Sequence, residues 1–302
     1  MPSKTVLITG CSAGGIGHTL AMEFQRRGLT VFATARSTSK MSGLEKLPNT
    51  TLLSLDVTSP TSIAEAVERI KAQTGGKLDY LVNNSGRNIM IPALDADIDD
   101  AKEMFDVNFW GILRMVQGFA PLLIEAKGTI VNIGSIVAYL HKPFTSKLEF
   151  PERSVARALS LADRLRAGLY NASKAAVHQF DETLRLEMAP LGVKVVTVVT
   201  GSIETNIITN CPEPHLPPTS RYLAAKGALD KQYENKLDFK QATPDAFAKQ
   251  VVGDVLGGAV GKVFRGPYAG TVRWASHIMP MWMQDRILLD GSDLDKVGKT
   301  AS

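Results

Sequence analysis

The sequence predicts an α/β fold in which helices cover both faces of a parallel, doubly wound sheet. Two observations support that prediction. Apolar stretches of strand length alternate with helical patterns along most of the chain, which is the order of a sheet built from strand–helix–strand units. The first strand is also followed at once by a glycine-rich turn and a helix, which favours the same class of fold.

Short apolar runs bounded by turn residues mark the strands, and apolar residues at helical spacing mark the helices. Strands are expected at residues 4–9, 30–35, 51–55, 78–82, 129–133, 193–199 and 262–265. Helices are expected to end before Gly28, to begin at Pro60, and to span residues 99–124, 170–188 and 244–257, since proline favours a first helical turn and glycine a last one. We expect one domain over residues 1–266 and an amphipathic C-terminal extension over 267–302.

The composition is typical of one globular α/β domain. The chain has 302 residues, of which 44% are hydrophobic, enough for a sizeable core. Its 34 basic and 30 acidic residues leave a net charge of +4. Because the basic residues are spread along the chain rather than clustered, we expect no nucleic-acid partner.

Cysteine usage and the N-terminus indicate where the protein works. Cys11 and Cys211 form neither a metal-ligand spacing nor a disulfide framework, so we expect a reducing compartment and no bound metal. The strand that starts at Lys4 leaves no room for a signal peptide, and no apolar run reaches the roughly 18 residues of a spanning helix. We expect a cytoplasmic protein, either soluble or peripheral on the endoplasmic reticulum or on lipid droplets.

The glycine-rich turn at residues 10–17 is a candidate phosphate cradle. Glycines let the backbone approach a pyrophosphate, and the N-terminus of the following helix adds oriented N–H groups and a partial positive charge. A tight turn without any ligand is the alternative. The candidate cofactor-binding residues of this turn are Gly10, Ser12, Gly15, Ile16 and Gly17.

The ends of the next strands supply further candidate cofactor contacts. Arg36 follows the second strand, where an NAD-specific protein places a carboxylate; it is either a ligand of the NADPH 2′-phosphate or a plain surface charge. Asp56 and Val57 follow the third strand, at the edge where ligands collect. Asn83, after the fourth, either ties adjacent strands together or borders the cofactor. NADPH is therefore the expected cofactor.

Tyr170 and Lys174 are the candidate catalytic pair, because residues four apart on a helix lie on one face, one turn apart. Tyrosine titrates near 10, so proton transfer near neutrality needs its pKa to fall by about two to three units. An ammonium about 4 Å away supplies about 4 kcal/mol, but only in a cleft that excludes most water. A solvated helix face is the alternative.

Two further polar residues are candidates for the same site. Ser135 follows the strand at residues 129–133, and Asn108 lies among apolar neighbours in the helix at 99–124. A buried amide needs hydrogen-bond partners. Asn108 is therefore either a satisfied core residue or part of a polar chain that reaches the active site.

With these motifs in order, the sequence from Lys4 to about Arg265 resembles the short-chain dehydrogenase/reductase family. The resemblance implies a Rossmann fold and an NADP-dependent enzyme whose hydride comes from the cofactor. It implies that Ser135 holds the substrate carbonyl and Tyr170 donates the proton. Lys174 would bind the nicotinamide ribose and lower the Tyr170 pKa, while Asn108 would hold a water of a proton relay.

The same resemblance assigns the remaining motifs. It implies that Thr9–Gly17 is the cofactor glycine motif, Asp56-Val57 the adenine contact, Asn83–Gly86 the sheet-stabilising motif, and Gly201, Ile203 and Thr205 the nicotinamide-side loop. Within the family, the sequence is similar to 1-acyldihydroxyacetone-phosphate reductases and their fungal relatives. That narrower likeness rests on residues 8–17, 33–36, 199–201 and 274–289.

The sequence departs from the family pattern in four places. The glycine turn has one extra residue, Ser85 replaces the usual alanine, and Thr200 replaces a common proline. Ser135 and Tyr170 are 35 positions apart, where relatives have a short loop. The extra segment, about residues 141–168, is a basic lid that favours an anionic substrate, a tolerated surface excursion, or a segment wrongly included in the protein.

The C-terminal extension is rich in aromatic residues and methionine and carries Arg273 and Arg286. Through residues 267–289 it is expected either to contact a lipid surface or substrate entrance, or to form a core or homo-oligomer contact. We expect an NADPH-dependent reductase of a hydrophobic, lipid-derived ketone, with substrate loops at 141–168 and 202–243. The alternatives are a ketoreductase of polyketide-, terpene- or steroid-like metabolism, and a non-catalytic NADP-sensing binding protein.

Overall fold

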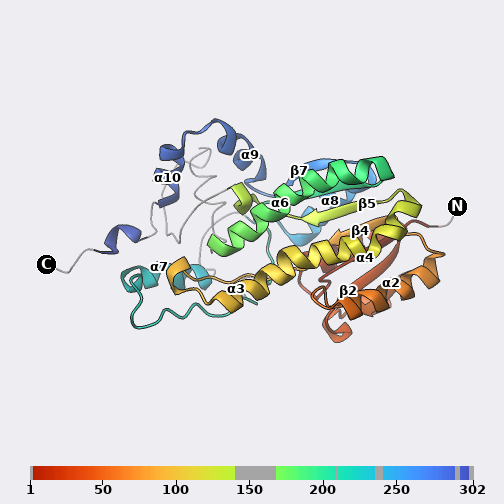
Figure 1. Ribbon diagram of the computed structural model, residues 1–302, viewed down its shortest axis with the longest axis horizontal. Coiled ribbons are helices and arrows are strands. Elements are labelled where there is room, and N and C mark those ends of the chain that lie inside the picture. The colour runs from red at the N-terminus through yellow and green to blue at the C-terminus, as the bar shows by residue number, and fades with distance from the viewer. Residues whose placement is uncertain (1–2, 140–167, 208–209, 235–240, 290–292, 299–302) are drawn as a thin grey trace.

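The computed structural model describes residues 3–139, 168–207, 210–234, 241–289 and 293–298. Within them, parallel strands form one seven-stranded sheet in the order β3-β2-β1-β4-β5-β6-β7 (Figure 1). The strands are β1 (Thr5–Ile8), β2 (Thr30–Ala35), β3 (Thr50–Ser54), β4 (Tyr80–Asn83), β5 (Thr129–Ile133), β6 (Lys194–Thr200) and β7 (Gly261–Arg265). The strand order changes direction between β1 and β4, so the predicted doubly wound sheet is confirmed.

The helices follow the strands as the alternating pattern predicted. The α-helices are α1 (Ile16–Arg26), α2 (Pro60–Thr74), α3 (Ile98–Phe105), α4 (Gly111–Ala126), α6 (Gly168–Met188), α7 (Lys226–Tyr233), α8 (Pro244–Leu256), α9 (Ala269–Ile278) and α10 (Met281–Leu289). Short 3₁₀ turns lie at Thr38–Lys40, Leu44–Lys46, Ala93–Asp95, Ile136–Tyr139, Ala189–Leu191, Leu223–Ala225 and Leu294–Lys296.

Helices cover both faces of the sheet because its strands are apolar on both sides. In β1, Val6 and Ile8 belong to a core that also holds residues of α1 and α8, whereas Leu7 belongs to a second core with α2, α4 and α6. The carboxyl ends of the strands therefore meet at one edge between the two helical layers, where ligands bind in open α/β sheets.

The helix expected at residues 99–124 is not one regular helix. A π-helical turn, Asp106–Trp110, separates α3 from α4 and holds Asn108. The stretch Ile98–Ala126 is long and apolar enough, by length and composition, to cross a membrane. Its buried residues, among them Phe119 and Leu123, pack in the core beneath the sheet, and this burial accounts for their apolar character.

Two of the segments expected to govern specificity are only partly described. The segment at residues 141–168, for which a basic lid, a surface excursion or a wrongly included segment was expected, lies outside the described residues except for Gly168. The segment at 202–243 contains α7 and a small core of Leu216, Ala225 and Leu229. Of the C-terminal extension, the inner face of α9 packs on β6 and on the 3₁₀ turn after β5.

Candidate active site

Tyr170 and Lys174 lie in the first turns of α6, at the carboxyl end of β5. Both side chains are buried, and the Lys174 ammonium lies 5.9 Å from the centre of the Tyr170 ring. Lys174 Nζ donates a hydrogen bond to the main-chain oxygen of Ile133 at 2.9 Å. The helical spacing in the sequence thus brings the two groups into one water-poor site beside the sheet.

Burial changes the protonation of both groups. Desolvation raises the pKa of Tyr170, so its phenol stays protonated at neutral pH. Desolvation also lowers the pKa of Lys174 to about 8, while the charge of Asp181 raises it. The expected fall of the Tyr170 pKa is therefore absent in this structure, because the cost of burying a phenolate raises that pKa.

Asn108 connects the π-helical turn to α6, the helix of the candidate catalytic pair. Its Oδ1 accepts a hydrogen bond from the Arg87 main-chain N–H at 2.8 Å, and its Nδ2 donates to the Arg87 oxygen at 2.9 Å and to Ser173 Oγ at 3.1 Å. Ser173 Oγ in turn donates to the main-chain oxygen of Tyr170 at 2.7 Å. Asn108 is thus fully satisfied and also part of a polar chain that reaches Tyr170.

Ser135 lies at the same end of β5 as the lysine contact. It is buried, and its Oγ accepts a hydrogen bond from the Val137 main-chain N–H at 3.3 Å. Val137 belongs to the apolar cluster that surrounds the Tyr170 ring. Within the described part of the chain, no hydrogen bond links the Ser135 hydroxyl to the Tyr170 hydroxyl.

The glycine turn has the shape of a cradle. Gly10 and Gly14 adopt positive φ angles of 73° and 77°, which favour glycine. A Cβ on Gly17 would lie 2.5 Å from both Asn84 Nδ2 and the Gly10 oxygen, so no larger residue fits. Asn84 Nδ2 holds the turn by donating to the oxygens of Thr9 and Gly10 at 2.9 and 3.1 Å.

The helix that follows this cradle starts without a side-chain cap. Gly15 precedes α1, its N–H donates to the Ser12 oxygen at 3.1 Å, and neither a capping side chain nor an acidic residue lies in the first turn, at Ile16 and beyond. Uncapped N–H groups at a helix start bind anions. The residues present therefore fit the pyrophosphate of a dinucleotide.

The other candidate cofactor residues, at the ends of β2, β3 and β4, differ in exposure and in their contacts. Arg36 is exposed at the end of β2, and no ion pair holds it among the residues with described positions. Asp56 Oδ1 accepts hydrogen bonds from the N–H and hydroxyl of Thr58, at 2.9 and 2.7 Å. Val57 is buried against the start of α4. Asn83 donates to Asn132 Oδ1 at 2.8 Å, which ties β4 to β5.

The loop after β6 closes against the glycine turn. Ile203 is buried and bridges to Ala242, and Thr205 follows on the half-exposed part of the loop. Asn206, which the sequence did not single out, donates from Nδ2 to the Ala13 oxygen at 3.3 Å. At Gly201, an added Cβ would lie 2.0 Å from the Pro267 oxygen, so glycine is required there.

Sequence reasoning also missed the polar residues on the buried face of α6. Asp181 accepts hydrogen bonds from Asn132 Nδ2 at 2.6 Å and Thr197 Oγ1 at 2.7 Å, and burial raises its pKa to about 6. His178 contacts the turn after β5. Their spacing was the available signal, because positions 170, 174, 178 and 181 follow one face of a helix.

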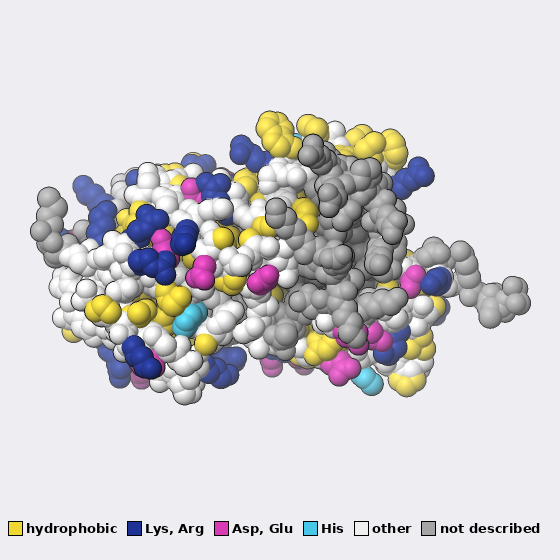
Figure 2. Space-filling model, turned by 180° about the vertical axis from the view of Figure 1, so that it is seen from behind, with side chains coloured by type: hydrophobic (Ala, Val, Ile, Leu, Met, Phe, Trp, Pro, Cys, Tyr) yellow, Lys and Arg dark blue, Asp and Glu magenta, His cyan; other side chains and the backbone are white. Residues whose placement is uncertain are grey.

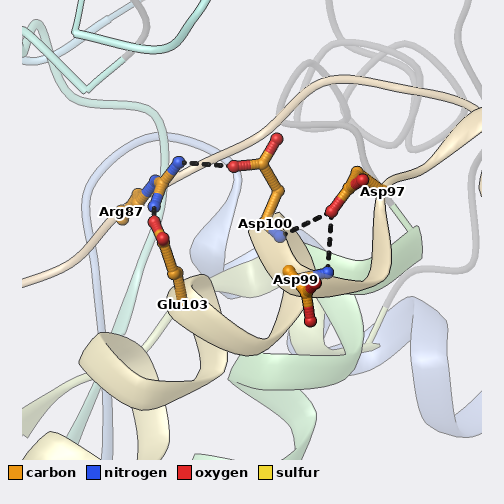
Figure 3. Close-up of polar contacts among 5 residues, drawn as sticks. All are labelled: Arg87, Asp97, Asp99, Asp100 and Glu103. Carbon is orange, nitrogen blue, oxygen red and sulfur yellow. Dashed lines mark hydrogen bonds and ion pairs between the residues drawn. The ribbon is translucent and has the colours of Figure 1, made fainter.

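Arg87 anchors the segment after β4 to α3. Its guanidinium bonds to Asp100 at 3.2 Å and to Glu103, while Asp97 caps the helix through the N–H groups of Asp99 and Asp100 (Figure 3). Because Asn108 also holds the Arg87 backbone, the segment after β4 is tied both to α3 and to the π-helical turn. The guanidinium itself is already engaged by two carboxylates.

The outer surface of α9 and α10 is apolar. Its exposed large side chains are Trp274, Ile278, Met281, Trp282, Met283 and Leu289. Figure 2 shows hydrophobic side chains gathered along this edge of the molecule, with Lys or Arg side chains at both ends. The opposite face of α9, with Ala269 and Val272, packs against Ile136, the residue after the candidate catalytic serine. The extension thus has one core face and one solvent-facing apolar face.

Comparisons with known proteins find relatives over most of this chain. A family model described as "short chain dehydrogenase" matches residues 4–147 and 156–215. A short-chain dehydrogenase of Penicillium ochrochloron is 44% identical over 95% of this chain and 97% of its own length. The NADPH-dependent 1-acyldihydroxyacetone phosphate reductase of Saccharomyces cerevisiae is 34% identical over 98% and 93%.

A solved structure shares the fold as well. A short-chain dehydrogenase from Burkholderia cenocepacia, crystallised in complex with NADP, superposes with a TM-score of 0.69 at 23% identity, and the match covers 95% of this chain and 98% of that one. At this identity the likeness supports the architecture alone.

Proposed function

This chain belongs to the short-chain dehydrogenase/reductase family, and on that premise we propose that it reduces a ketone to a secondary alcohol with NADPH. The proposed substrate is hydrophobic, such as a lipid-derived ketone. One observation carries the proposal: a protonated phenol and a lysine ammonium are buried together at the end of the strand that bears Ser135.

The chain's own residues suit the proton-transfer half of such a reduction. NADPH, when bound, supplies the hydride. Tyr170 is the proton donor in the proposal, and the burial that raises its pKa keeps the proton on the phenol until an alkoxide develops. Ser135 supplies a hydroxyl for the carbonyl oxygen. Asn108 and Ser173 hold the main chain of Tyr170, which limits the motion of the ring.

Three features support NADPH as the cofactor. Close packing against the protein itself requires small residues at Gly10, Gly14 and Gly17, and such a glycine turn lets the backbone approach a pyrophosphate. Arg36 presents an exposed guanidinium where the 2′-phosphate of NADPH would lie, and the strand ends there without a carboxylate. The yeast relative carries NADPH dependence in its name.

The apolar surroundings of Tyr170 support a hydrophobic substrate. Its ring packs with Ile89, Met104, Val137 and, at the edge, Ile207. Such a lining favours an alkyl or polycyclic ketone over a small polar one.

A ketoreductase acting on a neutral polyketide-, terpene- or steroid-like substrate is the second candidate. A phosphate ester needs a cation at the site. Among the residues that the structure describes, the Arg87 guanidinium, whose backbone bonds to Asn108, is already paired with Asp100 and Glu103. That pairing favours a neutral ketone over an acyl glycerophosphate.

The deciding experiment measures NADPH oxidation with a panel of ketones, both neutral and phosphorylated. If acyl glycerophosphate analogues inhibit turnover, the lipid-derived substrate is supported. If they leave turnover unchanged, the neutral polyketide-, terpene- or steroid-like substrate is supported. NADPH binding without oxidation by any ketone would overturn the reductase and leave an NADP-sensing binding protein.

We also propose that the apolar face of α9 and α10 contacts a lipid surface, in a cytoplasmic protein peripheral on the endoplasmic reticulum or on lipid droplets. Two exposed tryptophans with basic neighbours are typical of interfacial helices. A homo-oligomer contact through the same face is the competing proposal, and flotation with vesicles together with sedimentation separates the two.

A further inference from the structure

His178 is a buried residue of α6 that makes a direct contact with the backbone of the candidate catalytic serine. Its Nε2 lies 3.2 Å from the main-chain nitrogen of Ser135. Gly134, the residue before the serine, has no side chain, and a Cβ there would lie only 2.2 Å from Nε2. The imidazole therefore fits against the turn after β5 only because residue 134 is glycine.

This contact fixes the tautomer of the imidazole. A main-chain N–H only donates, so Nε2 must be the unprotonated nitrogen that accepts. In the neutral ring, the proton then lies on Nδ1, which is buried and has no hydrogen-bond partner among the described residues. The surroundings favour the neutral ring: burial, then the charges of Lys262 and Lys174, lower the pKa of His178 to about 3.

Within the described part of the chain, this contact joins two other hydrogen bonds between α6 and β5 or the turn that follows it. Asp181 accepts from Asn132, Lys174 donates to the oxygen of Ile133, and His178 accepts from the N–H of Ser135. Each contact is one helical turn from the next along α6, so together they set the register between the helix and the strand end. The helix carries Tyr170 and the strand end carries Ser135, so this register sets how the two hydroxyls lie.

We propose that His178, neutral and protonated on Nδ1, positions the Ser135 hydroxyl by accepting a hydrogen bond from the Ser135 main-chain N–H. The inference rests on the proposed reductase function and adds to it a positioning residue beyond Tyr170, Lys174, Ser135 and Asn108. His178 touches neither the substrate nor the cofactor in this assignment. It acts through the backbone of the serine, and the Tyr139 ring lies tilted against the imidazole, with 5.3 Å between the ring centres.

Two amide substitutions of His178 test whether an acceptor atom at the position of Nε2 is required. Glutamine carries its Oε1 at about the reach of Nε2, and asparagine carries its Oδ1 only at about the reach of Nδ1. We expect His178→Asn to lower kcat for a ketone found by the panel by about 10- to 100-fold, at unchanged NADPH affinity, since a 1 Å misplacement costs on that order. His178→Gln should recover most of the loss.

A stability control separates positioning from packing. Leu184→Ala removes a buried side chain on the same helix, away from the turn after β5. It should lower the midpoint of thermal unfolding while kcat, measured well below that midpoint, stays near the wild-type value. His178→Asn with kcat within twofold of wild type, or His178→Gln as slow as His178→Asn, would overturn the proposal.

The tautomer of His178 can also be measured by NMR without any substrate. Long-range ¹H–¹⁵N correlation spectra of the full chain with NADPH, assigned with His178→Gln, should show a pyrrole-type Nδ1 and a pyridine-type Nε2 for this histidine. A protonated Nε2 would refute the assignment even if the enzyme is active. If no ketone is turned over, the proposed function fails while this spectrum still decides the contact.

Discussion

Lys174 Nζ donates a hydrogen bond to the main-chain oxygen of Ile133 at 2.9 Å, so the candidate catalytic lysine is held by the end of the strand that leads to Ser135. The same ammonium lies over the face of the Tyr170 ring at 5.9 Å. One buried cation thus connects the helix, the strand end and the phenol. The chemistry expected of the site follows from this arrangement.

Replacing Tyr170 with phenylalanine should abolish reduction while NADPH binding survives. The change removes the proton donor and keeps the ring in its apolar cluster of Ile89, Met104 and Val137. General acid catalysis contributes about 10²–10⁴-fold, so kcat should fall by at least that factor. Initial rates with the best ketone of the panel, with fluorescence titration of NADPH, check the prediction; a variant that keeps a tenth of the wild-type rate would contradict it.

Replacing Asp181 with asparagine should move the alkaline limb of the pH profile to lower pH. Lys174 loses its proton as the pH rises through about 8, and the charge of Asp181 raises that pKa. Without the carboxylate the ammonium is lost earlier, so kcat/KM should begin to fall at a lower pH. Profiles from about pH 6 to about pH 10 check this. Glu182→Gln, which removes the neighbouring carboxylate, is the control. If kcat/KM falls at the same alkaline pH in Asp181→Asn and in the wild type, Asp181 does not raise the pKa of Lys174.

The fold was largely predictable because its signals are local. Each strand is a short apolar run between turn residues, and the predicted strands match β1–β7 with small shifts at their ends, such as residues 78–82 against Tyr80–Asn83. The π-helical turn was not predictable. It coincides with Asn108, which bonds to the distant Arg87 backbone, and no helical periodicity reports such a contact.

In the candidate site as well, residues with a local sequence signal were predictable and residues defined by distant contacts were not. Tyr170 and Lys174 are found from spacing on one helix. Asn206 is 193 residues from its partner Ala13, so no pattern in either segment indicates that they meet. His178 and Asp181 shared the face of the catalytic pair, but their partners lie on β5 and β6, and only the folded sheet shows what a buried imidazole and carboxylate contact there.

Replacing Gly17 with alanine should weaken both folding and NADPH binding. The new Cβ would lie 2.5 Å from Asn84 Nδ2 and from the Gly10 oxygen, and backbone cannot give way easily. Overpacking of this kind costs about 1–3 kcal/mol. Gly253→Ala in α8 is the control, since nothing lies within 4 Å of its added Cβ, and it should stabilise the helix by about 0.5–1 kcal/mol. Urea unfolding and NADPH titration check both; equal behaviour of the two variants would count against the cradle.

Replacing Arg36 with alanine should weaken NADPH binding and leave NADH binding unchanged. The guanidinium is exposed at the end of β2, where it can reach the 2′-phosphate that only NADPH carries. Hydrogen bonds to charged groups contribute about 1.5–3 kcal/mol, so the Kd for NADPH should rise about 10- to 100-fold. Arg69→Ala, on the exposed side of α2, is the control. Equal losses for both cofactors would show that Arg36 does not select between them.

Replacing Trp274 and Trp282 with serine should release the protein from anionic vesicles. Both indoles are well exposed, at 68% and 64%, on the apolar face of α9 and α10. Burying one large apolar side chain contributes about 1.5–3 kcal/mol, so losing even part of two such contributions should lower vesicle binding at least about tenfold. Co-flotation of the full chain with phosphatidylserine-containing liposomes measures this.

The control for the vesicle experiment is Trp110→Ser, because Trp110 is also exposed, at 48%, but lies in the π-helical turn between α3 and α4. It should float as the wild type does if the α9–α10 face makes the contact. The oligomer is favoured if the wild-type chain does not float with the liposomes and sediments as a dimer. A second copy would then cover the apolar face and exclude it from water in place of lipid. In that case, replacing Trp274 and Trp282 should lower the sedimentation coefficient from that of a dimer to that of a monomer. The lipid proposal then fails.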